Sequence, residues 1–371
     1  MVKITERLVA LDAFRGATIA LMILVNNPGS WNYVYTPFDH AEWNGCTPTD
    51  LVFPFFLFIV GVAMRYSFRR YEYRLTGDLL KKIVKRMIII FLVGSAMAAF
   101  PFIRQDWDWS HFRIMGVLQR ISLAYGFGAI LAVSLKPKTR WITSGIILIG
   151  YWLALWLFGG PDPFSLEHNL VRKIDLAVLG AGHMWHGKGI PFDPEGLFST
   201  LPAIVTVLLG YEVGVLIQTK TDKLEVVKDL FALGAAWGVV GWIWGLVFPI
   251  NKSIWTSSYV LYTGGLAAIV LGAMIWVIDI KGYKKAVQPL VVFGMNSIFV
   301  FTASGIWGRI ILKIKYNLNG EVVSGYTYLY ETVFRPLAGN YNGSLLFALF
   351  HVFMWWLVVR WMYKNRIFIK I

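Results

Sequence analysis

Long apolar stretches, separated by polar connections, recur along the whole chain. An α-helix needs about 20 apolar residues to cross the hydrocarbon core of a bilayer. Stretches approaching that length lie near residues 12–28, 49–67, 83–101, 114–134, 141–158, 198–217, 228–248, 255–279, 287–311 and 344–363. The pattern predicts an all-α fold: a polytopic integral membrane bundle of about ten transmembrane helices, with residues 1–371 forming a single transmembrane domain.

The connections between these stretches differ in their content of Lys and Arg. With ten spans and both chain ends in the cytoplasm, 24 of the 35 basic residues lie inside and 10 lie outside. Basic residues favour the cytoplasmic side, and none occurs between Arg15 and Arg65. We therefore expect the connections 29–48, 102–113, 159–197, 249–254 and 312–343 to lie outside.

Composition supports the membrane assignment and excludes other classes. Only 15% of the residues are charged, whereas a soluble domain carries about 25%. The net charge of +14 lies in short clusters between apolar stretches, which is typical of topology signals rather than of a nucleic-acid surface. The single cysteine, Cys46, excludes an internal disulfide and a multi-cysteine metal site, and we expect no metal.

Polar side chains at the ends of the spans are the functional candidates. An ionisable or amide group inside a membrane costs several kcal/mol unless it is paired or hydrated. Near the inner end of the first span, Asp12 and Arg15 share one helical face, as an anchoring ion pair or as part of a site. A second set is expected at the outer end: Asn26, Asn27, His40, Asn44, Asp50, Gln119, Arg120, Asp193, Glu195, Asn251 and Lys252.

His40 is the strongest candidate of the second set. It lies in the segment DHAEWNGCTPTDLVFPFF, which leads into a span rich in Phe. Imidazole exchanges protons near neutral pH, so His40 suits a general base or an acyl carrier, although it is also compatible with a hydrogen-bonding loop residue. Asn44 can donate to an oxyanion. Asp50 can orient the imidazole, bind a substrate hydroxyl or cap the following helix, as Thr49 also can.

These residues predict a polar site in a membrane protein without separating an enzyme from a transporter. Several segments add that information: LDAFRG, VNNPGSW, HAEWNGCTPTDLVFPFFLFIVG, GVLQRI, DPEGLFSTLPAIVTVLLG, NKSIWTSSYV and FGMNSIFVF. Together, and in this order, they resemble the heparan-α-glucosaminide N-acetyltransferase family, and this chain is similar to its bacterial members.

The resemblance implies an acetyl-CoA-dependent transmembrane acetyltransferase. Acetyl would move from cytosolic acetyl-CoA to an amino sugar on the far side of the membrane. The family's active histidine corresponds to His40, and an asparagine at the end of its first conserved span corresponds to Asn26. Within a tunnel through the bundle, Asn26, Asn44 and Arg120 would polarise the thioester. We further assign Arg120, Arg15, Asn296 and Lys281 to the donor, and Glu195, Asn251 and Lys252 to the sugar.

Some features remain open. The animal enzyme has an additional lumenal domain and leading helix that this sequence lacks, so we expect a glucosamine-type acceptor at a bacterial plasma membrane rather than heparan sulfate. The alternatives are O-acetylation of an envelope polysaccharide and amino-sugar transport without chemistry. His40 acts either as a base in direct transfer, which we favour, or as an acetyl carrier. A homodimer is plausible from the resemblance.

Overall fold

The computed structural model describes residues 8–100 and 109–369 and divides the chain into two compact units. Unit 1 comprises the chain up to Phe38 together with Leu216–Gly234 and Ala267–Lys370. Unit 2 comprises Asp39–Val215 and Ala235–Leu266. The chain passes from one unit to the other after Phe38 and again within three helices, α7 (Thr200–Thr219), α8 (Lys223–Trp244) and α9 (Ser257–Met274).

The all-α prediction is confirmed, but the count of ten spans is not. Within the described residues, eight helices are long and apolar enough to cross a membrane, and a bent pair makes up to nine. The predicted span at 83–101 corresponds to α3 (Gly77–Ala99), which stays outside this set. Its last 18 residues still contain Lys82, Lys85 and Arg86. Residues 101–108, at the end of that span and in the next connection, lie outside the described part.

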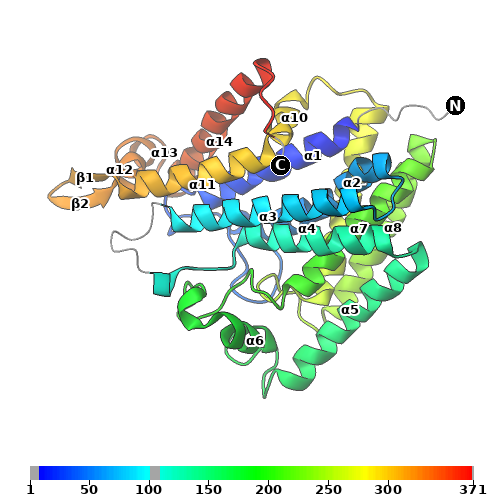
Figure 1. Cartoon of the computed structure of the whole chain (residues 1–371). Coiled ribbons are helices and arrows are strands. Elements are labelled where there is room, and N and C mark those ends of the chain that lie inside the picture. Colours follow the sequence, from blue (N-terminus) through cyan, green and yellow to red (C-terminus); the bar gives the residue numbers. More distant parts are fainter. Residues whose placement is uncertain (1–7, 101–108, 370–371) are drawn as a thin grey trace. The chain divides into compact units, whose positions relative to one another are not determined.

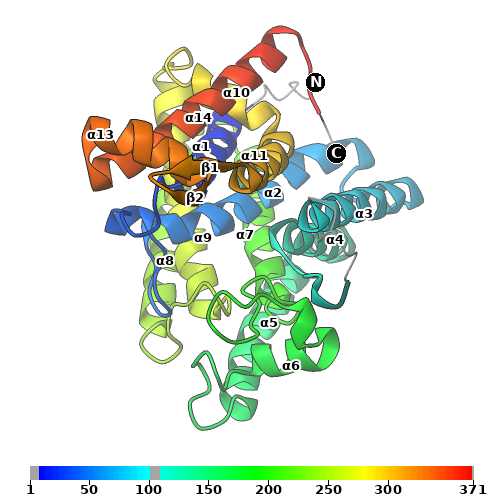
Figure 2. The same ribbon diagram turned by 90° about the vertical axis from the view of Figure 1, so that its left-hand side faces the viewer.

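Unit 1 is built around α1, which packs against α10 and α14 (Figures 1 and 2). Gly16 of α1 and Gly294 of α10 face each other's helix, and a Cβ at either position would overlap a backbone carbonyl oxygen of the other. Small residues of this kind let two membrane helices approach closely. The helices and helical turns of this part of unit 1 are α1 (Val9–Asn26), the 3₁₀ turn Thr36–Phe38, the π-helical turn Ile275–Ile280, α10 (Gln288–Met295) and α14 (Asn340–Lys364).

The predicted span at 287–311 is a bent pair of helices. α10 and α11 (Ser297–Lys313) meet at an angle of 81°, with Asn296 between them. The connection at 312–343 is also more regular than its sequence indicates, since it contains a two-stranded antiparallel hairpin and several helical turns. These elements are β1 (Lys315–Leu318), β2 (Glu321–Ser324), α12 (Gly325–Leu329), the π-helical turn Tyr330–Phe334 and α13 (Arg335–Ala338).

Unit 2 carries the candidate outer site. In Figure 1, α3 lies along α4, and Gly94 and Gly126 bring the two helices together against Gln119 and Met87. The elements wholly within the unit are the 3₁₀ turns Pro48–Leu51, Phe68–Tyr71, Trp109–His111 and Ala181–His183, and the helices α2 (Val52–Ser67), α3, α4 (Val117–Ser134), α5 (Pro137–Phe158) and α6 (Leu170–Leu179).

Close backbone contact fixes α2, the helix that follows the HAEWNG segment. A Cβ at Gly61 of α2 would overlap the carbonyl oxygen of Val207 in α7, and one at Gly210 of α7 would overlap that of Phe58 in α2. The two glycines therefore allow α2 and α7 to pack almost backbone to backbone. This contact fixes α2, which directly follows the turn Pro48–Leu51 that contains Asp50.

The long connection at 159–197 is ordered, as predicted, but includes the unpredicted helix α6. Asp175 of α6 is fully buried and accepts hydrogen bonds from the backbone N–H groups of Leu197 and Phe198, at 3.0 and 3.1 Å. Gly196 makes this approach possible, because a Cβ there would overlap a carboxylate oxygen of Asp175. α6 is thereby tied to the entry of α7.

The burial of Asp175 predicts a pH-dependent stability. Burial raises its pKa from 3.8 to about 6, although the hydrogen bond from Phe198 and the charge of Arg120 oppose the shift. Between these values the folded protein binds a proton that the unfolded chain has released, so the free energy of unfolding falls as the pH rises from about 4 to about 6. We expect the melting temperature to fall over this interval, and Asp175→Asn to flatten the fall. An equally steep profile in the variant would contradict this assignment.

Candidate active site

His40 and Asp50 form the centre of the site, on the loop that leads into α2. Nδ1 of His40 lies 2.7 Å from Oδ1 of Asp50. The Asp50 side chain is almost fully buried, at 2% exposed, whereas that of His40 is 45% exposed. The pair therefore combines a fixed, water-excluded carboxylate with an imidazole that a substrate can reach.

The loop folds around the Asp50 carboxylate because its neighbours supply the hydrogen bonds that a buried charge requires. Oδ2 of Asp50 accepts from the backbone N–H groups of Ala41 and Thr47, at 3.0 and 3.1 Å, and from the Thr47 hydroxyl at 3.1 Å. Thr47 and Asp50 make a capping box at the start of the Pro48–Leu51 turn. The predicted capping role belongs to Thr47 and Asp50, not to Thr49, because Thr47 is the residue with extended backbone before the turn.

Lys252 joins the pair from the connection before α9. Its Nζ lies 3.3 Å from Oδ1 of Asp50 and 3.2 Å from Nδ1 of His40. Asn251 holds this connection in place: its side-chain oxygen accepts from the Ile254 N–H, and its backbone N–H donates to the Thr256 hydroxyl. The predicted candidates His40, Asp50, Asn251 and Lys252 are thus brought together by the fold.

These distances determine which imidazole nitrogen carries the proton. An ammonium has three donors and no acceptor, and a carboxylate only accepts. Asp50 is the closest partner of Nδ1, so Nδ1 donates to Asp50, and Lys252 donates to the same carboxylate oxygen rather than to the ring. Within the described residues no hydrogen bond engages Nε2 of His40. Neutral His40 therefore presents the lone pair of Nε2 at the exposed face, as a general base requires.

The orientation of Asn44 follows from the same network. Because Oδ1 of Asn251 accepts from Ile254, Nδ2 of Asn251 faces Asn44 and donates to its Oδ1 at 3.1 Å. The side-chain oxygen of Asn44, an exposed residue, is thus engaged, which leaves its NH₂ group as the end of the amide that does not bond to Asn251. Gly45, with φ at +117°, donates its N–H to the Ile250 carbonyl at 2.7 Å and ties the two loops together.

Trp43 anchors the same loop to the connection at 159–197. Its indole N–H donates to the Phe164 carbonyl at 2.8 Å, and its ring packs edge to face against Phe192. His183 in turn accepts at its backbone carbonyl from the Ile114 N–H. Contacts within unit 2 therefore join residues in or beside the connections 29–48, 102–113, 159–197 and 249–254. The distribution of Lys and Arg assigns all four connections to the outer side.

Two other predicted residues lie in a buried ionic layer beside this site. Arg120, fully buried, donates to the Gly196 carbonyl and the Ser199 hydroxyl, and its guanidinium lies 5.0 Å from the Trp255 ring. Glu195 lies 2.6 Å from Arg113, which also pairs with Asp193 at 2.7 Å. The donor role of Arg120 and the sugar role of Glu195 remain predictions, and both side chains already support loops of unit 2.

The remaining predicted residues belong to unit 1. Asn26 is the last residue of α1, with an exposed side chain. Arg15 pairs with Asp12 at 3.3 Å, as the spacing predicts. Lys281 lies 5.3 Å from the Trp276 ring. The Asn296 amide bonds backbone at both ends, donating to the Ile367 carbonyl and accepting from the Ile369 N–H.

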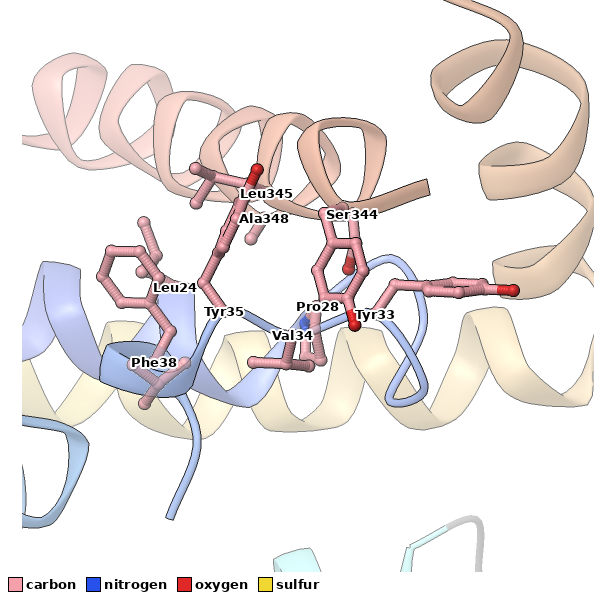
Figure 3. A pocket seen from close by; sticks show the side chains of 11 residues that line it. Leu24, Pro28, Tyr33, Val34, Tyr35, Phe38, Ser344, Leu345 and Ala348 are labelled. Carbon is pink, nitrogen blue, oxygen red and sulfur yellow. The ribbon is translucent and has the colours of Figure 1, made fainter. Parts of the chain in front are cut away.

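Figure 3 shows a hollow in unit 1 between the segment after α1 and α14. Its walls are largely apolar, with Leu24, Val34, Phe38 and Ala348 among them. The open space is about 20 Å³, which is room for about one water molecule. A sugar does not fit there, so the hollow does not compete with the His40 loop as a substrate site.

Sequence reasoning missed several residues that build the site. Thr47 has a recognisable signal, because a threonine three residues before an acidic residue is the pattern of a capping box. Tyr259 has no such signal, although its fully buried hydroxyl donates to the Asp50 carbonyl at 2.5 Å.

Cys46 lies in the same loop. Burial raises the pKa of its thiol to about 12, which argues against Cys46 as a nucleophile.

Comparison with known proteins identifies the family. Residues 7–241 match the family described as "Heparan-alpha-glucosaminide N-acetyltransferase, catalytic". The heparan-alpha-glucosaminide N-acetyltransferase of Homo sapiens is 30% identical over 80% of this chain and 52% of its own length. That of Mus musculus is 29% identical over 80% of this chain and 53% of its own. The chain spans about half the length of these curated relatives. The family match includes the loop that joins His40 to Asp50, and the chain belongs to the heparan-α-glucosaminide N-acetyltransferase catalytic family.

Proposed function

We propose that this protein transfers acetyl from acetyl-CoA on the cytoplasmic side to the amine of a glucosamine-type sugar on the outer side of a bacterial plasma membrane. The observation that carries the proposal is the His40–Asp50 pair, in which a buried carboxylate leaves Nε2 of an exposed imidazole open to a substrate. The family assignment supports the class of reaction, and the names of the relatives support the acceptor.

The chemistry of N-acetylation explains why a neutral histidine is needed. An amine attacks a thioester only through its nitrogen lone pair, and it must lose a proton to become an amide. Nε2 of His40 takes that proton as the N–C bond forms, and Asp50 stabilises the resulting imidazolium from the Nδ1 side. When the C–S bond breaks, the thiolate of CoA recovers the proton. A base of this kind contributes about 10²–10⁴ in rate.

Two groups at the site suit the negative charge that develops on the thioester oxygen. Asn44 is an exposed residue whose oxygen bonds to Asn251, so its NH₂ group is the end left to donate. Lys252 supplies a positive charge held by Asp50. Preorganised donors of this kind stabilise a tetrahedral oxyanion in acyl transfer. Asn26 stays a prediction for polarising the thioester, and Arg15, Arg120, Lys281 and Asn296 stay predictions for holding the donor.

The sidedness of the reaction is supported by charge and by helix length. α1 and the segment Pro48–Tyr71 are both long and apolar enough to cross a membrane, so the loop between them lies on one side. That loop has no Lys or Arg, whereas residues 65–86 contain eight. The acceptor side would therefore be outside and the basic side cytoplasmic, with both termini in the cytoplasm.

Site-directed labelling tests this orientation. In a Cys46→Ser background, Asn32→Cys should react with an impermeant thiol reagent added to intact cells, and Arg74→Cys only after the cells are opened. Both positions are exposed, so accessibility differs only through the membrane. The unsubstituted Cys46→Ser protein is the control. Labelling of position 74 and not 32 in intact cells would invert the proposed direction of transfer.

The catalytic pair is tested by substitution at both members. His40→Ala should abolish acetyl transfer, measured as CoA release with glucosamine, while acetyl-CoA still raises the melting temperature. Asp50→Asn should lower the rate by about 10²–10⁴, because the amide would donate to Nδ1 and move the ring proton to Nε2. His111→Ala, an exposed histidine of the same unit, is the matched control and should keep its activity. Full activity in His40→Ala would remove this residue from the mechanism.

Incubation with acetyl-CoA alone separates the two routes. In direct transfer, CoA is released only when an amine is present. In the acetyl-histidine route, one CoA per site appears in a burst, with acetyl on the peptide containing His40. We expect no CoA release without an amine, because an acetyl group on a 45% exposed imidazole would be lost to water and the donor wasted, which argues against the covalent route. A stoichiometric burst would establish the covalent route. In a separate assay with different acceptors, transfer to hydroxyl groups but not to amines would favour O-acetylation.

A further inference from the structure

We propose that a cavity beside Asn44 holds the acceptor sugar, and that Asp162 and Glu167 on its wall select amino sugars without acidic substituents. The inference rests on the proposed function, since it names the class of acceptor that the His40 site takes. The cavity lies within unit 2 and has a volume of about 300 Å³. That is the lower end of the range typical of small-molecule sites, and it suits one monosaccharide.

The wall chemistry of this cavity is that of a sugar site. Trp43 and Phe164 supply aromatic surface, and Leu166 and Pro249 supply apolar surface. Asn44, Ser165, Asp162 and Glu167 supply the polar groups. A hexosamine has apolar C–H faces and a rim of hydroxyl and amine groups, so it matches a few polar groups set among aromatic walls.

The cavity is physically continuous with the catalytic loop. Trp43 and Asn44 lie three and four residues after His40 in the same HAEWNG segment. Asn44 is bonded to Asn251, and the next residue, Lys252, reaches Asp50 and His40. Pro249, also among the lining residues, begins the same connection. A sugar in the cavity is therefore held by the residues that position the base.

Among the described residues that line the cavity, only Asp162 and Glu167 carry a charge, and both are exposed. The cations of the same connection are not among these lining residues. Arg172 donates to the carbonyls of Pro191 and Glu167, Lys173 to those of Phe158 and Gly159, and Lys188 to that of Glu42. The two carboxylates are thus the charges that a bound sugar meets directly on the described wall.

The field of these carboxylates favours a cationic amine and opposes a sulfate or carboxylate on the same sugar. Across a few ångströms of water, each pair of unit charges changes affinity by about fivefold. The repulsions from Asp162 and Glu167 act together on one anionic substituent, and solvent screens each of them. They therefore reduce the affinity for the anionic sugar by about fivefold to twentyfold.

Calorimetric titration tests the inference without depending on catalysis. The full-length His40→Ala protein is titrated with glucosamine and with glucosamine 6-sulfate. We expect glucosamine to bind about fivefold to twentyfold more tightly. In Asp162→Asn/Glu167→Gln, made in the same background, this ratio should fall to near one. Glu72→Gln/Asp78→Asn, which removes two exposed carboxylates elsewhere in unit 2, should leave it unchanged.

The outcomes separate the inference from the proposed function. Equal binding of the two sugars by the parent protein, or a ratio that survives loss of both carboxylates, would overturn the selectivity. If the protein with His40 intact acetylates glucosamine, the proposed transferase still holds in that case. If the sugars bind selectively but the protein with His40 intact releases no CoA, the proposed transferase is overturned and the selectivity remains.

Discussion

The site depends on one buried carboxylate at the entrance to a membrane helix. A charge that is almost excluded from water is tolerated only when it is paired and hydrogen-bonded on all sides. Asp50 meets this requirement with two backbone N–H groups, the Thr47 hydroxyl, the His40 ring and the Lys252 ammonium. Each donor comes from a segment that would otherwise be a free loop. Satisfying the charge therefore folds the loop, and the folded loop aims the imidazole.

This constraint explains why the HAEWNG segment has its particular residues. His40 and Asp50 make the pair, Trp43 ties the loop to the connection at 159–197, and Asn44 ties it to the connection before α9. Gly45 provides the positive φ that lets the loop turn against Ile250. Behind the loop, the glycine contact between α2 and α7 holds the helix that follows the turn with Asp50. A rigid support of this kind is what a positioned general base requires.

Sequence alone predicted the fold class, and its larger set of candidate residues contained the four that the fold brings together, because both depend on local signals. Apolar length predicted the helices, and polar residues at span ends predicted His40, Asp50, Asn251 and Lys252 as one set. Within the described residues, α3 is the one predicted span that is not apolar enough to count, because it combines a basic first half with an apolar second half. Sequence alone did not predict the 81° bend at Asn296 or the role of Tyr259, since both arise from contacts between segments distant in sequence. The bond between Asn44 and Asn251, 207 residues apart, could not be derived from spacing either.

Burial and hydrogen bonding separate two kinds of polar residue in unit 2. Arg113, Arg120, Asp175 and Asp193 lie in ion pairs or bonds to backbone, and the last three are fully buried. Such groups are costly to leave unpaired, so their partners hold the ends of α4, α6 and α7 in register. His40 and Asn44 differ, because each has one end fixed by a buried partner and the other end exposed. A reactive group needs both properties: a fixed orientation and an open atom. In this chain the sequence signal for a polar residue is the same in both cases, and only the three-dimensional partners distinguish support from chemistry.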